Sequence, residues 1–114
     1  MSLRVVIRRA IARPGDDPET LYYSPTMRIF SRRGRHVQLS PMRSTMLLEI
    51  AARGGYVTPD AFIDTLYGDD EDGGPDSARG GVYVRIAILR NLIKPLGLMI
   101  HAHWCVGYRI AEAA

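Results

Sequence analysis

Apolar residues recur at helical spacing in three segments of the chain, and each segment has a start or stop signal. The first runs from Ser40-Pro41 to Gly54-Gly55, because serine caps open amides, proline suits the first helical position and glycine ends a helix. The second begins at Thr58-Pro59, and the third runs from about Ser77 to Lys94. The predicted buried faces are Met42, Met46, Leu47, Ile50 and Ala51 in the first helix, Phe62, Ile63, Leu66 and Tyr67 in the second, and Val82, Ile86, Leu89 and Ile93 in the third.

Short segments on both sides of these helices have the alternation and the turn signals of strands. Residues 4–13 favour a strand, with a short amphipathic helix as the alternative. Further strands are predicted at 21–23, 27–30 and 36–39. Residues 31–35 contain the glycine that a hairpin turn between the last two needs, and residues 98–110 read as a closing hairpin. The order is therefore strands, three helices and a hairpin, which predicts an α+β fold.

The charge of the chain is unevenly distributed, although its net value is only +3. Fourteen of the 15 basic residues are arginine, and five of the 12 acids fall within residues 69–76, which leaves seven acids for the rest. A basic body of this kind suits a polyanionic partner, and a basic surface kept for solubility is the alternative. The acidic segment lacks the ordered ligands of a calcium loop, so we expect a solvated loop there.

Length and cysteine content limit the class of protein. The 114 residues allow one domain with one core, and Cys105, the single cysteine, permits no internal disulfide. The N-terminus lacks the apolar core of a signal peptide, and no apolar run approaches the roughly 20 residues of a membrane span. We therefore expect a cytoplasmic protein.

His101, His103 and Cys105 would point to one face if all three lay on a strand. A fourth metal ligand at suitable spacing is not apparent, and no activating base accompanies the thiol. We therefore predict no metal site, no cofactor and no catalytic activity.

Seven short pieces, spaced over about four-fifths of the chain, carry a resemblance to a known family. They are Arg33-Gly34, Val37-Gln38-Leu39-Ser40-Pro41, Leu47-Leu48, Gly55-Tyr56-Val57-Thr58, Phe62 with Leu66-Tyr67-Gly68, Val82-Tyr83-Val84-Arg85-Ile86 with Leu89-Arg90, and Val106-Gly107-Tyr108-Arg109-Ile110. With these pieces, residues 20–111 resemble the effector domain of OmpR/PhoB-type response regulators.

The resemblance implies a winged helix-turn-helix, with an N-terminal antiparallel sheet, three helices and a C-terminal β-hairpin wing. Residues 20–114 would form this DNA-binding domain, and residues 1–19 an N-terminal extension with an extra strand, which one interpretation pairs across a dimer. The family controls transcription by binding direct repeats in double-stranded DNA, often as a head-to-tail homodimer. The receiver domain that usually precedes it is absent here, so a complete chain would bind DNA without an aspartyl-phosphate switch, whereas an excised domain would leave this open.

The resemblance also assigns contacts with the DNA backbone. Arg85 and Arg90 match basic positions of the recognition helix that touch phosphate, and Tyr67 matches the aromatic residue that ends the second helix. Arg79 and Lys94 project to the same side as Arg90 and add charge there. For each arginine, solvated surface charge is the alternative.

The base-reading face departs from the family. Val84, Ala87, Ile88 and Asn91 lie opposite the predicted buried arc, and Ile88 stands where relatives often carry a base-contacting arginine. Asn91 can read adenine and the apolar side chains can meet thymine methyl groups, which would give a weakly specific surface leaning to A·T pairs. An apolar patch on a helix is also typical of a protein contact.

The wing departs as well, since Trp104 and Cys105 stand where the family pattern has an arginine and a glycine. Trp104 can stack on a sugar or wedge at a base step, but we expect it to pack on the body, because tryptophan is mostly buried. Tyr108 is expected to be a core or backbone-anchoring residue and not a base reader.

These observations together predict a transcription regulator that binds double-stranded DNA. The alternative is a protein-interaction module on the same fold that binds RNA polymerase or another regulator. In the family, the loop before the recognition helix often contacts RNA polymerase, and the acidic loop 69–76 is the predicted polymerase contact here.

Overall fold

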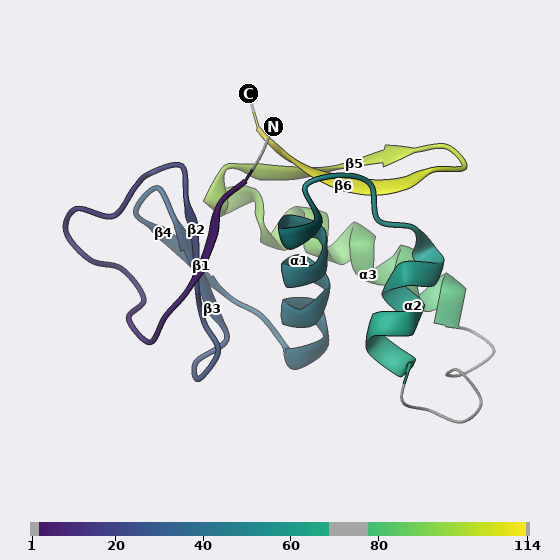
Figure 1. Cartoon of the computed structure of the whole chain (residues 1–114), viewed down its shortest axis with the longest axis horizontal. Helices are drawn as coiled ribbons and strands as arrows, with labels where there is room; N and C mark the ends of the chain where they lie inside the picture. The colour runs from purple at the N-terminus through teal and green to yellow at the C-terminus, as the bar shows by residue number, and fades with distance from the viewer. Residues whose placement is uncertain (1–2, 69–77, 114) are drawn as a thin grey trace.

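The computed structural model describes residues 3–68 and 78–113, with only the backbone of residues 78 and 79. A four-stranded N-terminal sheet packs beside three helices, and a two-stranded hairpin follows the third helix (Figure 1). The elements are β1 Val5–Ile7, β2 Leu21–Ser24, β3 Ile29–Arg32, β4 Arg35–Gln38, α1 Pro41–Arg53, α2 Pro59–Tyr67, α3 Ala78–Leu92, the 3₁₀ turn η1 Lys94–Leu96, β5 Leu98–His103 and β6 Gly107–Glu112. The predicted α+β winged-helix fold is confirmed.

The N-terminal sheet has the order β1-β2-β3-β4, with β2, β3 and β4 antiparallel. The prediction of a strand at 27–30 was wrong at both ends, because Arg28 has a φ of 54° and belongs to the preceding turn, so β3 starts at Ile29 and continues to Arg32. The turn between β3 and β4 is then only Arg33-Gly34, with φ values of 54° and 74°. Two left-handed residues in a two-residue loop are the type I′ geometry that matches strand twist.

Residues 5–7 form a strand, so the helical alternative for this segment was wrong. β1 pairs in parallel with β2 of its own chain, with Val5 opposite Leu21 and Ile7 opposite Tyr23. An otherwise antiparallel sheet thus gains one parallel edge strand. The connection from β1 to β2 is held by Arg8, which donates to both oxygens of Asp16 at 2.6 and 2.5 Å.

The start signals of the first two helices act as predicted. Ser40 Oγ accepts a hydrogen bond from the Arg43 amide at 3.4 Å, and Thr58 Oγ1 accepts one from the Ala61 amide at 3.0 Å. Gly54 ends α1 with a left-handed φ of 70°. The predicted acidic loop and the cap of the third helix lie outside the described residues.

The third helix ends at Leu92, two residues before the predicted limit, and continues as η1. Pro95 accounts for the difference, because a residue before proline avoids the α conformation and proline has no amide for the helical ladder. Gly97 then adopts a left-handed φ of 67° and turns the chain into β5.

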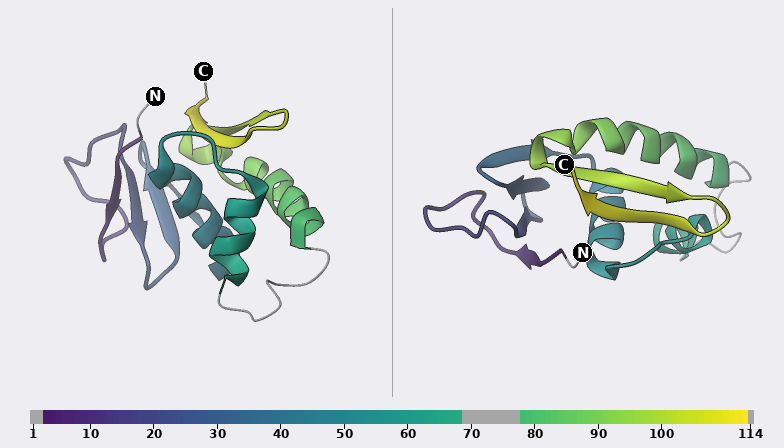
Figure 2. Two further views of the ribbon diagram at one scale, coloured as in Figure 1. Left: turned by 45° about the vertical axis from the view of Figure 1, so that its right-hand side comes forward. Right: turned by 90° about the horizontal axis from the view of Figure 1, so that it is seen from above.

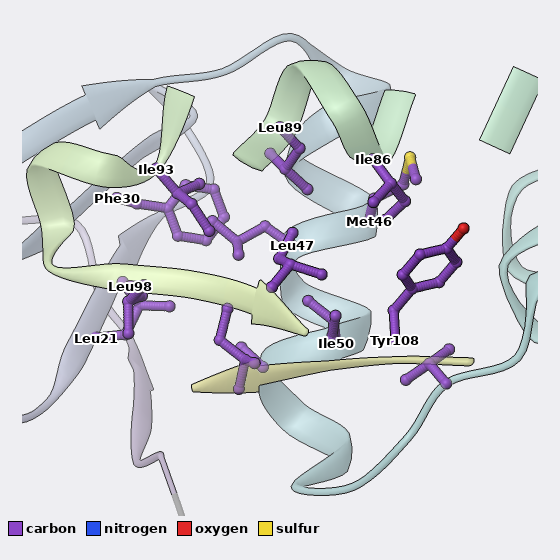
Figure 3. Packing of buried hydrophobic residues seen from close by; sticks show 14 of the residues in the cluster. Leu21, Phe30, Met46, Leu47, Ile50, Ile86, Leu89, Ile93, Leu98 and Tyr108 are labelled. Carbon is purple, nitrogen blue, oxygen red and sulfur yellow. The ribbon is translucent and has the colours of Figure 1, made fainter. Parts of the chain in front are cut away.

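The core lies between α1, α3, the inner strands of the sheet and the hairpin (Figure 3). The predicted arc of α3 is fully buried, and so is the inner face of α1 apart from Met42, which is half-buried. In α2 only Phe62 is fully buried, since this short helix packs on α1 and α3 from one side. Each fully buried leucine or isoleucine contributes roughly 1.5–3 kcal/mol, so this core holds α3 firmly against the domain.

One charged side chain, Arg32, is completely buried. Its guanidinium donates to Glu112 Oε1 at 2.6 Å, to the Leu96 carbonyl at 2.9 Å and to the Gly97 carbonyl at 3.2 Å. It also reaches Glu19 Oε2 at 3.3 Å. Arg32 therefore joins the N-terminal sheet to the base of the hairpin.

Candidate nucleic-acid interface

The outward stripe of α3, which we define as Val84, Ala87, Ile88 and Asn91, is exposed. It lies opposite the buried arc, because residues spaced by three, four and seven return to one side of a helix. Val84 is 61% exposed and Ile88 37% exposed, so this side of α3 faces away from the core.

The basic residues of α3 lie beside this stripe. Arg85 is half-buried on one flank and Arg90 on the other. Arg90 Nε donates to the Ile100 carbonyl of β5 at 3.2 Å, which fixes the end of α3 to the hairpin. Lys94 is exposed in η1, whereas the side chain of Arg79 lies outside what the structure describes.

The hairpin β5–β6 runs alongside α3, and its turn lies at the same end of the molecule as the start of α3 (Figure 2, right). At this turn Trp104 is 89% exposed, so our expectation that it packs on the body was wrong. The turn closes by a bond from the Val106 amide to the His103 carbonyl at 3.0 Å, so the indole stands at the tip of a short loop and faces solvent. The exposed indole is available to a ligand.

The base of the turn is held tightly against the segment before α2. The Val57 and Tyr108 backbones exchange hydrogen bonds at 2.7 and 2.9 Å. A Cβ on Gly107 would lie 2.3 Å from the Val57 carbonyl oxygen, so only glycine permits this approach. Tyr108 is buried as predicted, and burial raises the pKa of its hydroxyl. The exposed tip therefore projects from a rigid base.

Several aromatic and basic side chains surround this base, and sequence reasoning did not assign them to nucleic-acid binding. The ring of Tyr56 lies 5.5 Å from that of His103, and the guanidinium carbon of Arg109 lies 5.6 Å from the Tyr56 centroid. Tyr83, 48% exposed, contacts Tyr108 edge-on at 6.4 Å. The strand register places Arg109 opposite His101, but contacts with Tyr56 depend on the tertiary fold.

A cleft of about 720 Å³ opens between the start of α2, α3 and the hairpin. Tyr83, His103 and Trp104 contribute to its lining. The cleft thus runs from α3 to the tip of the hairpin.

The remaining sequence candidates are placed as follows. Tyr67 is the last residue of α2 and is half-buried. His101 and His103 lie on β5, but Cys105 lies in the turn with a φ of 61°, so the three do not share one strand face. In residues 3–68 and 78–113 no group of three histidine, cysteine or acidic residues is arranged to hold a metal ion. No helix in these ranges is long and apolar enough to cross a membrane.

Neither a protein-family model nor a curated protein matches the chain, but solved structures do. The C-terminal domain of the nisin resistance regulator NsrR, a lantibiotic response regulator, is 22% identical with a TM-score of 0.64, over 79% of this chain and 89% of that one. The DNA-binding domain of E. coli CadC is 22% identical with a TM-score of 0.63, over 81% and 86%. The Klebsiella pneumoniae RstA DNA-binding domain, solved in complex with the RstA box, is 29% identical with a TM-score of 0.59, over 80% and 90%. The chain therefore has the fold of OmpR/PhoB-type winged-helix DNA-binding domains, as its sequence motifs indicated.

Proposed function

We propose that this chain binds double-stranded DNA, with α3 in the major groove and the β5–β6 hairpin on the adjacent backbone or minor groove, and that it regulates transcription. The observation that carries the proposal is the arrangement of α3. Its inner arc is locked in the core, its outward stripe is free, and basic side chains border the stripe. The similarity to the RstA domain, which was solved on its DNA box, supports the same docking.

Phosphate contacts supply most of the affinity in this proposal. Arg85, Arg90, Lys94 and Arg79 are the cations assigned to the backbone, and Tyr67 donates its hydroxyl to a phosphate. Because Arg90 Nε already serves the Ile100 carbonyl, the rest of its guanidinium is oriented before DNA arrives. A side chain ordered in advance loses less entropy on binding.

Base contacts come from the outward stripe and from the wing tip. Asn91 and Ile88 face the groove, and Trp104 stacks on a sugar or wedges at a base step. The proposal assigns no catalytic role to the chain, and it places the protein in the cytoplasm, the compartment expected from the sequence.

Fluorescence anisotropy with a labelled random-sequence duplex tests the proposal. Four cationic contacts give a salt slope of roughly −3.6, so affinity should fall about 150-fold from 50 to 200 mM salt. Arg9→Ala is the matched control, since Arg9 is exposed just after β1, the edge strand of the sheet farthest from β4. Absence of binding at low salt would contradict DNA binding and favour the protein-interaction alternative, which a polymerase pull-down then tests.

Two further partners belong to this proposal. A second copy of the chain would bind the adjacent half of a direct repeat, and sedimentation on duplexes with one and two sites measures this. RNA polymerase would contact the acidic loop, whose structure is not described. Neutralising Asp69 to Asp72 should then reduce activation while DNA affinity stays constant, and unchanged activation would reject this contact.

A further inference from the structure

The outward stripe carries no charged side chain. Its members are three apolar residues, Val84, Ala87 and Ile88, and one amide, Asn91. Arg85 and Arg90 are half-buried on the flanks, and Arg90 is anchored to β5. The exposed centre of this side of α3 is therefore uncharged.

This composition restricts which bases the stripe can recognise. In the major groove, guanine presents two acceptors, and its usual partner is an arginine or lysine that donates to both. No such donor stands on the stripe. The 5-methyl group of thymine is the apolar group in that groove, and adenine presents the acceptor and donor pair that a carboxamide matches.

We propose that the outward stripe reads A·T base pairs, with Val84, Ala87 and Ile88 against thymine methyl groups and Asn91 on an adjacent adenine. This inference rests on the proposed DNA binding and names the sequence class that the site selects. Val84 and Asn91 are seven residues apart, which is about 10 Å along a helix, so the stripe spans about three base pairs at 3.4 Å each.

Burial on DNA also accounts for the exposed apolar surface. Val84 and Ile88 stand one turn apart at 61% and 37% exposure. An isolated exposed apolar residue is ordinary, but a continuous apolar stripe marks a contact surface. A thymine methyl group that covers one of these side chains removes apolar area on both partners, so each methyl contact favours binding about fourfold.

Selection from a random duplex library is the first test. The expected result is a core of about three A·T pairs in the recovered sequences. Recovery of a G·C core, or binding without any sequence preference, would overturn the inference while DNA binding itself stands. Failure to bind any duplex would instead contradict the proposed function.

The second test separates methyl readout from the shape of A·T-rich DNA. Each thymine of the selected core is replaced by deoxyuridine, which removes only the methyl group in the major groove and leaves the minor groove unchanged. We expect about fourfold weaker binding at one or two positions. Equal affinity for every uracil duplex would overturn the inference.

A variant cycle connects the methyl effect with the stripe. Ile88→Ala should remove the difference in affinity between the thymine and uracil duplexes at one position. Because Ile88 is exposed, the variant should stay folded, which thermal denaturation checks. Ile7→Ala is the matched control, since Ile7 is also exposed but lies on β1. If Ile88→Ala and Val84→Ala both keep the full difference in affinity between thymine and uracil duplexes at every position, the stripe does not read the methyl groups.

Discussion

Replacing the buried Arg32 with methionine tests whether this residue joins the two halves of the domain. Methionine keeps the length of the side chain but removes its charge and donors. The Leu96 and Gly97 carbonyls lose partners at 2.9 and 3.2 Å, and Glu112 loses its contact at 2.6 Å. Each lost hydrogen bond to a charged group corresponds to roughly 1.5–3 kcal/mol.

The expected loss in the free energy of unfolding is smaller than the sum of these hydrogen-bond contributions. Glu112 and Glu19 are 39% and 58% exposed, so water solvates their carboxylates in the variant. Breaking a fully buried pair costs about 3–5 kcal/mol, and partial solvation brings the expected loss for Arg32→Met to about 3 kcal/mol. For a domain of this size the melting temperature should fall by roughly 10 °C.

Urea unfolding monitored by circular dichroism measures this loss of stability, and Arg33→Met is the control. Arg33 contacts the same two carboxylates at 3.3 Å, but its side chain is 38% exposed, so its loss should be below about 1 kcal/mol. Equal effects of the two variants, or a loss below about 1 kcal/mol for Arg32→Met, would refute a special role for the buried guanidinium.

The other predictions concern acid stability and DNA contact. The hydrogen bond from Arg8 lowers the pKa of Asp16 to about 2. The ionised Asp16 carboxylate therefore stabilises the fold above its unfolded pKa near 4, and this stabilisation is lost as the pH falls towards 2. In urea unfolding, the difference in stability between the native chain and Asp16→Asn should shrink over this pH range; a constant difference, or the same difference in an Arg8→Gln background, would contradict the prediction. Arg90→Ala should weaken binding to all duplexes and reduce the salt slope by about one unit, and an unchanged slope would remove Arg90 from the phosphate contacts. Ile88→Arg should keep or strengthen DNA binding and shift selection towards guanine, whereas loss of a polymerase or regulator contact with unchanged base selection would indicate that the stripe binds protein. Trp104 is the single tryptophan and is 89% exposed, so its fluorescence should change when duplex DNA is added, and an unchanged spectrum at saturation would exclude the wing tip from the interface.

Local signals predicted the helices well because their physical causes are local. Ser40 and Thr58 cap α1 and α2 through their own side chains, and the arc of α3 was fixed by residue spacing alone. The strands were less predictable. β3 was misplaced because Arg28 adopts a left-handed conformation that no sequence signal marks, and the parallel pairing of β1 depends on packing against β2.

The candidate interface was predictable only in part, because some of its features are local to one helix and others depend on tertiary contacts. Helical projection placed the outward stripe correctly, since one helix defines its own faces. Two contacts join segments that are distant in the sequence: Arg90 with Ile100, and Tyr56 with Arg109. The periodicity of apolar residues does not predict contacts of this kind. Trp104 was misjudged because the general tendency of tryptophan to be buried does not hold at a hairpin tip.

The most direct measurement is a titration of the isotope-labelled chain with a short duplex, followed by NMR. If the chain binds DNA through α3 and the hairpin, amide shifts should concentrate in residues 80–94 and 101–109, and the Trp104 indole signal should move with them. Shifts confined to β1–β4, or no shifts with excess duplex at low salt, would contradict DNA binding through this face.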